Sequence, residues 1–219
     1  MRKTWLSAFV VAAAGVSLLA IAGCEPPQSV NPLSDPATAK ADPRLKGVFV
    51  ASLDGGEAWL HVNPRAAGPV VDVVLIGHDD QQGAMVLHYE GFATQIGKGS
   101  YLNLRAKKFE DILDQRYTLS PMYIFARYEI AKDGALTLSV MDDGPATKAI
   151  RKKEIEGKLS EGGLAADSNA VTGHGTLLTA DSAKLSAWVA KSTDQELFNA
   201  LGTFKKVDPK FPKPAAKTK

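Results

Sequence analysis

Two consecutive stretches of alternating apolar and polar residues, each folding back at a glycine-containing turn, constrain this chain more than any other feature. The first alternates from Met85 to Tyr89 and returns after Gly97-Lys98-Gly99-Ser100. The second spans Tyr123 to Val140 around the turn Lys132-Asp133-Gly134. Alternation with a period of two is typical of strands that bury one face. Two such hairpins in succession predict an antiparallel meander.

The flanking sequence extends this pattern in both directions. Leu45 to Ala51, Ala58 to Val62 and Pro69 to Ile76 are apolar segments of strand length. In the second of them alternate residues share a face, so Ala58, Leu60 and Val62 are expected to point inward. The predicted fold class is therefore mainly β: an antiparallel meander forming a barrel or a strongly curved sheet, with short α-helices near the C-terminus.

Helical spacing and capping residues predict four helices within this framework. The expected ranges are Phe109 to Tyr117, Pro145 to Lys153, Asp181 to Lys191 and Ser192 to Leu201. After the last of them, Phe204 and Val207 are expected to complete the sheet. Gly91 is expected to mark a β-bulge.

An export signal precedes all of this. Arg2 and Lys3 form a basic start, and Trp5 to Ala22 is apolar without an acidic residue. The run ends in Ile21-Ala22-Gly23-Cys24, which resembles the lipobox of bacterial lipoproteins at every position. The resemblance implies cleavage between Gly23 and Cys24, diacylglycerol on the Cys24 sulfur and acylation of the new amino terminus.

The same resemblance implies a location. The protein is expected in the cell envelope, bound to a membrane through the lipid on Cys24 and facing the periplasm. Glu25 stands where aspartate favours inner-membrane retention in enteric lipoproteins, so the outer membrane is expected rather than the inner one. An ordinary secretory signal or an uncleaved membrane helix is the alternative.

The chain divides into four parts by composition. We expect a signal peptide (1–23), the lipidated cysteine with a proline-rich tether (24–43), one β-rich globular domain (44–207) and a basic, disordered tail (208–219). Cys24 is the only cysteine, so no disulfide is expected.

The charge balance gives little reason to expect a polyanion partner for the domain itself. Removing residues 1–23 removes two of the 26 basic residues and no acidic residue, which leaves 24 of each sign. No nucleic-acid partner is expected. The tail after Asp208 is nevertheless basic, and its lysines are expected either to be solvated or to contact acidic lipid headgroups or cell-wall polymer.

No recognisable catalytic, phosphate-binding or calcium-binding motif is found in the sequence. The histidines His61, His78, His88 and His174 are far apart, which does not indicate a zinc site. No cofactor, metal site or catalytic residue is therefore predicted, although a triad scattered through the sequence leaves no such signature.

Aromatic residues concentrate on the predicted strands, where they either fill a core or line an apolar ligand cavity. The candidate ligand-binding residues are Trp59, Tyr89, Tyr101, Tyr123 and Tyr128. The meander with its early Gly47-Val48-Phe49 is similar to lipocalins, although Phe49 stands where that family has tryptophan.

Three functions remain open at this point. The first is a non-catalytic binding module for a small apolar molecule or lipid. The second is a structural or assembly partner of another envelope protein, using an exposed apolar patch or sheet edge. The third is a hydrolase with a nonlocal site, which a cleft of polar residues with shifted pKa values would support.

Overall fold

The structure of the chain is a computed structural model that describes residues 26–53, 56–66, 68–79, 83–111, 116–160, 175–192 and 194–208. The signal peptide, Cys24, His174 and most of the basic tail lie outside these ranges. No helix in the described ranges is long and apolar enough to cross a membrane.

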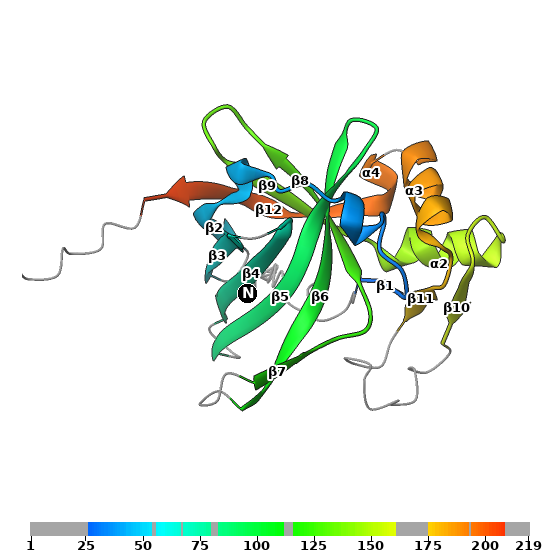
Figure 1. Cartoon of the computed structure of the whole chain (residues 1–219), viewed down its shortest axis with the longest axis horizontal. Helices are drawn as coiled ribbons and strands as arrows, with labels where there is room; N and C mark the ends of the chain where they lie inside the picture. Colours follow the sequence, from blue (N-terminus) through cyan, green and yellow to red (C-terminus); the bar gives the residue numbers. More distant parts are fainter. Residues whose placement is uncertain are drawn as a thin grey trace, which may run out of the picture.

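Eight of the described strands form a closed antiparallel barrel (Figure 1). Each strand pairs with the next barrel strand along the chain, as in the predicted meander. Pairing of the last strand with the first completes the ring. The strands are β2 (Gly47–Leu53), β3 (Gly56–Pro64), β4 (Val70–Asp79), β5 (Gly83–Ile96), β6 (Gly99–Asp111), β8 (Ile124–Ile130), β9 (Leu136–Met141) and β12 (Phe198–Val207).

The barrel interior is filled by the apolar faces of these strands. In β3 the side chains of Ala58, Leu60 and Val62 are buried, whereas Trp59 and His61 are exposed on the outer face, as the alternation predicts. The other buried residues of this inner core are Leu45, Phe49, Ala51, Val71, Val73, Ala93, Leu102, Leu104, Ala126, Tyr128, Leu136, Leu138 and Phe204.

A second core lies between one side of the barrel and the elements that cover it. It contains Tyr101, Phe125 and Met141 from barrel strands, packed with Leu185 and Trp188 of a covering helix. The covering elements are the strands β1 (Gln28–Ser29), β10 (Gly157–Leu159) and β11 (Thr176–Leu178), and the helices α2 (Asp143–Arg151), α3 (Ser182–Lys191) and α4 (Asp194–Leu197). Figure 1 shows these elements gathered on one side of the barrel.

The segment expected to be a free tether is fixed to the domain instead. Pro27, Ser29 and Leu33 are buried, and β1 pairs with β11. Two 3₁₀ turns follow, η1 (Pro36–Thr38) and η2 (Pro43–Leu45), before β2 begins. The prediction was wrong because the prolines of this segment stiffen a chain that packs on the barrel, and composition alone does not distinguish that case from a solvated linker.

Two helix predictions also fail. In place of a helix from Phe109 to Tyr117, β6 continues to Asp111 and the short strand β7 (Arg116–Leu119) pairs back onto it. The helix predicted from Ser192 to Leu201 is shorter than expected, since α4 ends at Leu197. Residues from Phe198 onward belong to β12 and pair with β9. In both places the apolar spacing fits a helix, but strand pairing overrides that preference, with the adjacent strand β6 in the first case and with the distant strand β9 in the second.

The other two helices are confirmed close to their predicted ranges. α2 begins two residues earlier than expected, and the Asp142 side chain accepts a hydrogen bond of 3.0 Å from the Gly144 amide at its N-terminus. α3 spans Ser182–Lys191 and is capped by Asp181.

Gly91 does not form a bulge. It lies in regular register between Val71 and Leu104. A Cβ atom at Gly91 would lie 2.2 Å from the backbone oxygen of Asn103. Glycine is therefore required here because two strands approach closely, not because the ladder is interrupted.

Candidate functional site

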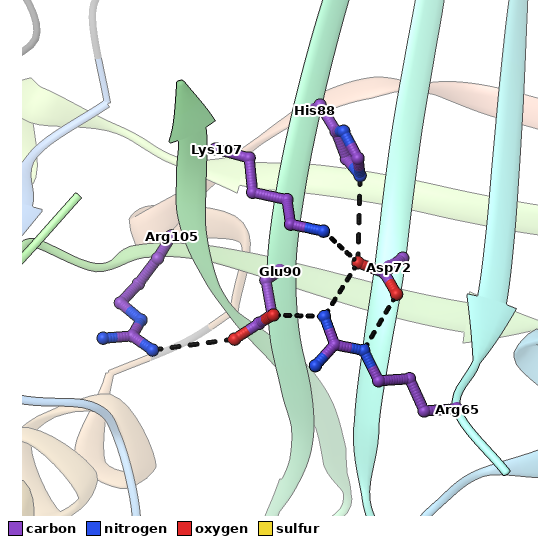
Figure 2. Close-up of polar contacts among 6 residues, drawn as sticks. All are labelled: Arg65, Asp72, His88, Glu90, Arg105 and Lys107. Carbon is purple, nitrogen blue, oxygen red and sulfur yellow. Dashed lines mark hydrogen bonds and ion pairs between the residues drawn. The ribbon is translucent and has the colours of Figure 1, made fainter. Parts of the chain in front are cut away.

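A network of charged and titratable side chains covers the outer face of β4, β5 and β6 (Figure 2). Strand register builds it, because Asp72 lies opposite Glu90, and Glu90 lies opposite Arg105. These residues alternate with Val71, Val73 and other inward-facing side chains, so they share the outer face. The members of the network are Arg65, Asp72, His88, Glu90, Arg105 and Lys107.

Each carboxylate in the network is held by at least two cations. Asp72 accepts hydrogen bonds of 3.0 and 3.2 Å from Arg65 and one of 2.8 Å from Lys107. Glu90 accepts a hydrogen bond from Arg65, and its Oε1 lies 3.7 Å from Nη2 of Arg105. Nε2 of His88 lies 3.8 Å from Oδ1 of Asp72.

The protonation states follow from this pairing. Burial alone would raise the pKa of Asp72, but hydrogen bonds from Arg65 and Lys107 outweigh it and lower the pKa to about 2. The hydrogen bond to Asp72 raises the pKa of Arg65. Burial, with the nearby Lys107 charge, lowers the pKa of His88, which keeps this imidazole neutral near pH 7.

The ion pairs of the network link β4, β5 and β6 at the point where β6 separates from β5 and pairs with β7. The last pair between β5 and β6 joins Tyr89 to Ala106, and from Lys107 onward β6 pairs with β7. The Lys107 side chain is only 7% exposed, and its Nζ lies 4.1 Å from the centroid of the Tyr117 ring. Ion pairing explains the pKa shifts of Asp72 and Arg65, and burial is the largest cause of the shift of His88, so the shifts alone do not indicate catalysis.

A second charged feature, the basic end, lies where β8 turns into β9. A depression of about 450 Å³ there is lined by three cationic side chains, Arg44, Lys132 and Lys206. Its other lining residues are Ile130, Ala131 and Gly134, so the described part of the lining contains no carboxylate.

The three cations differ in how far they are already neutralised. Arg44 forms an ion pair of 2.6 Å with Asp42, and this hydrogen bond lowers the pKa of Asp42. Lys132 and Lys206 make no ion pair with any described residue, and Nζ of Lys206 lies 5.6 Å from the centroid of the Phe49 ring. Both lysines are exposed, so their charges are available to a ligand.

A row of apolar side chains crosses the outer face of β3, β4 and β5. Trp59 lies opposite Ile76, and Ile76 lies opposite Val86. The three side chains are 40%, 42% and 62% exposed, respectively. Contiguous exposed apolar surface of this kind is typical of sites that contact other molecules.

A polar pocket of about 680 Å³ lies between α2 and the antiparallel strands β10 and β11. Asp143 and Thr147 line it from α2, and Thr176 lines it from β11. The hydroxyls of Thr147 and Thr176 are 2.6 Å apart, and Thr147 donates a hydrogen bond of 3.2 Å to Oδ2 of Asp143. Oδ1 of Asp143 is buried without a hydrogen-bond partner among the described residues.

The five aromatic residues predicted to bind a ligand do not line one cavity. Tyr89 and Tyr128 belong to the inner core, where the Tyr128 hydroxyl donates a hydrogen bond of 3.0 Å to Asp42. Tyr101 and Tyr123 pack in the second core, and the Tyr101 and Phe198 ring centroids are 5.4 Å apart. Trp59 is exposed on the outer face.

Sequence reasoning missed the charged network and the basic end. The alternating polar residues of β4, β5 and β6 were a signal for the network, but strand register decides which of them meet. Of the predicted site residues, Cys24 and Gly23 lie outside the described ranges, so the lipidation and cleavage predictions are unchanged.

Comparisons with known proteins found no matching protein-family model, no matching curated protein and no matching solved structure. The resemblances to bacterial lipoproteins and to lipocalins therefore stay predictions.

Proposed function

We propose that this protein is a lipid-anchored component of the cell envelope that acts by binding, and that its ligand is an anionic polymer of the envelope bound at the basic end of the barrel. The observation that carries the proposal is the depression lined by Arg44, Lys132 and Lys206, with no carboxylate among its described lining residues. Cations clustered around a concave surface raise the local concentration of anionic ligands and hold them once bound.

The sequence that leaves the basic end adds to its charge. β12 ends at Val207, next to Lys206 of the depression, and the chain continues with Lys210, Lys213, Lys217 and Lys219 without an acidic residue after Asp208. The cationic surface and the cationic tail therefore begin at the same end of the barrel. An extended polymer bearing phosphate or carboxylate groups can contact both of them at once.

The barrel interior offers less support for a ligand. Its inward positions carry buried side chains such as Phe49, Leu60 and Phe204, which fill the space as in other small barrels. The proposal therefore keeps the binding module expected from the sequence but moves the ligand from an aromatic-lined cavity to a charged surface.

Titration of the purified lipidated protein in detergent with fluorescent polyphosphate, and separately with poly-glutamate, tests the proposal. Because each lysine near an anionic surface contributes about 1 kcal/mol, the double variant Lys132→Gln, Lys206→Gln should bind roughly 30-fold more weakly. The matched control is Lys148→Gln, Lys191→Gln, which removes the same charge from exposed positions on α2 and α3. Equal affinities for the two double variants would contradict the proposal.

Deletion of residues 209–219 separates the tail from the barrel surface. If the deletion abolishes binding while Lys132→Gln, Lys206→Gln does not weaken it, the tail alone is the binding element. Raised salt should weaken binding in every variant that still binds, because these charges are exposed and screened.

A second candidate function is docking of another envelope protein on the apolar row of Trp59, Ile76 and Val86. The observation that favours it is the cross-strand register of three exposed apolar side chains beside a charged network, which resembles the apolar centre and polar rim of protein interfaces. A photo-crosslinking residue in place of Ile76 should then give a discrete product in intact cells, and Val86→Glu should remove it. The same residue in place of Glu129, which is exposed on β8, is the control.

A further inference from the structure

The chain that would carry the lipid enters the domain through a small sheet on its surface. β1, β11 and β10 form this three-stranded sheet, in which Leu177 lies between Gln28 and Lys158. Burial alternates along the first strand, because Pro27 and Ser29 are buried whereas Gln28 is half-buried and Val30 is 43% exposed. Gln28, Leu177 and Lys158 therefore share the outer face of this sheet, and Val30 lies beside them.

Hydrogen bonds hold this entry segment on both sides. Ser29 exchanges two backbone hydrogen bonds of 2.8 Å with Tyr123, the residue that precedes β8. The Val30 amide donates a hydrogen bond of 3.0 Å to Leu178, and the Asn31 side chain donates one of 2.9 Å to the carbonyl of Ala180. The chain is therefore part of the folded domain from β1 onward.

Covalent geometry then limits the distance between the domain and the lipid. Cys24 and Gln28 are four residues apart, and a fully extended chain of that length spans at most about 14 Å. A tether of the length expected from the sequence would have let the domain stand away from the bilayer. With the chain fixed at β1, a lipid on Cys24 holds this sheet at the headgroup layer.

We propose that the outer face of the sheet β1, β11 and β10 rests on the lipid bilayer. The inference rests on the proposed lipidation of Cys24. The chemistry of the face fits that position, because Val30 and Leu177 offer apolar surface and the exposed Lys158 offers a cation for anionic headgroups. The surface thus adds a second, weaker contact to the acyl chains and fixes the orientation of the barrel.

This orientation directs the basic end away from the anchoring membrane. β8 begins beside Ser29 and ends at the turn that carries Lys132. Its seven residues span roughly 20 Å. Lys132 and Lys206 therefore lie about one strand length from Ser29, away from the surface that we place on the bilayer.

Fluorescence quenching in vesicles tests the orientation. The lipidated protein carrying Val30→Cys, and separately Lys132→Cys, is labelled with a fluorophore and reconstituted in vesicles of phosphatidylethanolamine and phosphatidylglycerol. A lipid with a spin-labelled headgroup is the quencher. The label at Val30 should be quenched several-fold more strongly than the label at Lys132, and equal quenching, or stronger quenching at Lys132, would overturn the inference.

An insertion provides the matched control. About 12 Gly and Ser residues placed between Glu25 and Pro26 add roughly 20 Å of reach. The insertion should leave co-sedimentation with vesicles intact and reduce the quenching at Val30 to the level seen at Lys132. Unchanged quenching at Val30 would show that the surface binds lipid without help from the short link, which overturns the role assigned to it.

The experiment also separates this inference from the lipid anchor itself. A wild-type protein that does not co-sediment with vesicles would overturn the anchor and the orientation together. A protein that co-sediments but shows equal quenching at Val30 and Lys132 would overturn the orientation alone.

Discussion

The backbone amide of Leu33 donates a hydrogen bond of 2.7 Å to Oδ1 of Asn103, 70 residues away in the sequence. Both residues are completely buried. Asn103 also donates a hydrogen bond of 2.7 Å to Oγ1 of Thr94, so both the oxygen and the nitrogen of its side-chain amide are hydrogen-bonded. This contact fastens the N-terminal segment to the wall of the barrel and gives the segment a structural role.

Shortening Leu33 should therefore destabilise the whole domain. Leu33→Ala leaves a cavity in the second core and should lower the free energy of unfolding by about 2–5 kcal/mol. Asn103→Ala leaves the Leu33 amide buried without a partner and should cost about 1–3 kcal/mol. Urea unfolding followed by tryptophan fluorescence measures both.

Asp35→Ala, which removes an exposed cap of η1, is the control and should cost about 1 kcal/mol or less. Equal effects of Leu33→Ala and Asp35→Ala would mean that the segment is not part of the core.

The close approach of β5 and β6 gives a second prediction. Gly91→Ala would force a Cβ atom to within 2.2 Å of the Asn103 backbone oxygen. We expect a loss of about 3 kcal/mol or more, because neither strand can move without disturbing the ladder. Gly77→Ala on β4 is the matched control, since its Cβ atom would lie 3.7 Å from Cε of Met85, an ordinary contact. Its stability should change by less than about 1 kcal/mol. Thermal unfolding of the two variants distinguishes them, and a stable Gly91→Ala protein would contradict the register between β5 and β6.

The charged network predicts a pH dependence of stability. The pKa of Asp72 falls from its ordinary value of 3.8 to about 2 in the folded protein. As pH decreases, the unfolded chain therefore takes up the proton first, and the stabilisation is lost between these two values. The contribution present above pH 3.8 is on the order of 2 kcal/mol.

Asp72→Asn measures this contribution directly. The variant should be less stable than the wild type by about 2 kcal/mol near neutral pH, and the difference should shrink as pH approaches 2. Glu156→Gln breaks an exposed ion pair with Lys184 and should change stability far less than Asp72→Asn at any pH. A difference between wild type and Asp72→Asn that does not depend on pH would show that Asp72 is not held ionised by its partners.

The lipid anchor has its own test. Labelled palmitate should enter the wild-type protein and should not enter Cys24→Ala, because the proposed lipobox would place the acyl chains on and beside that residue. Two or three acyl chains, at about 0.8 kcal/mol per buried methylene, would make the proposed anchor effectively stable. The wild type should therefore fractionate with membranes, whereas Cys24→Ala should be released. Equal labelling of both proteins would rule out lipidation at Cys24.

The sequence by itself determined the hairpins and the faces of their strands. Alternation in segments such as Ala58 to Val62 fixes which side chains point inward, and turns such as Lys132-Asp133-Gly134 fix which strands are neighbours. Both are local properties, so they are readable from residues close together in the chain. They were sufficient to predict an antiparallel meander that forms a barrel or a strongly curved sheet.

Only the tertiary structure decided the remaining features, because each depends on contacts between residues far apart in the sequence. Pairing of β12 with β2 closes the ring, and pairing of β12 with β9 replaces the end of the helix predicted from Ser192 to Leu201 by a strand. Burial of Leu33 against the barrel turns an expected tether into part of the domain. Strand register likewise brings Asp72, Glu90 and Arg105 into one network, and a shift of a single residue would have placed them on the inner face.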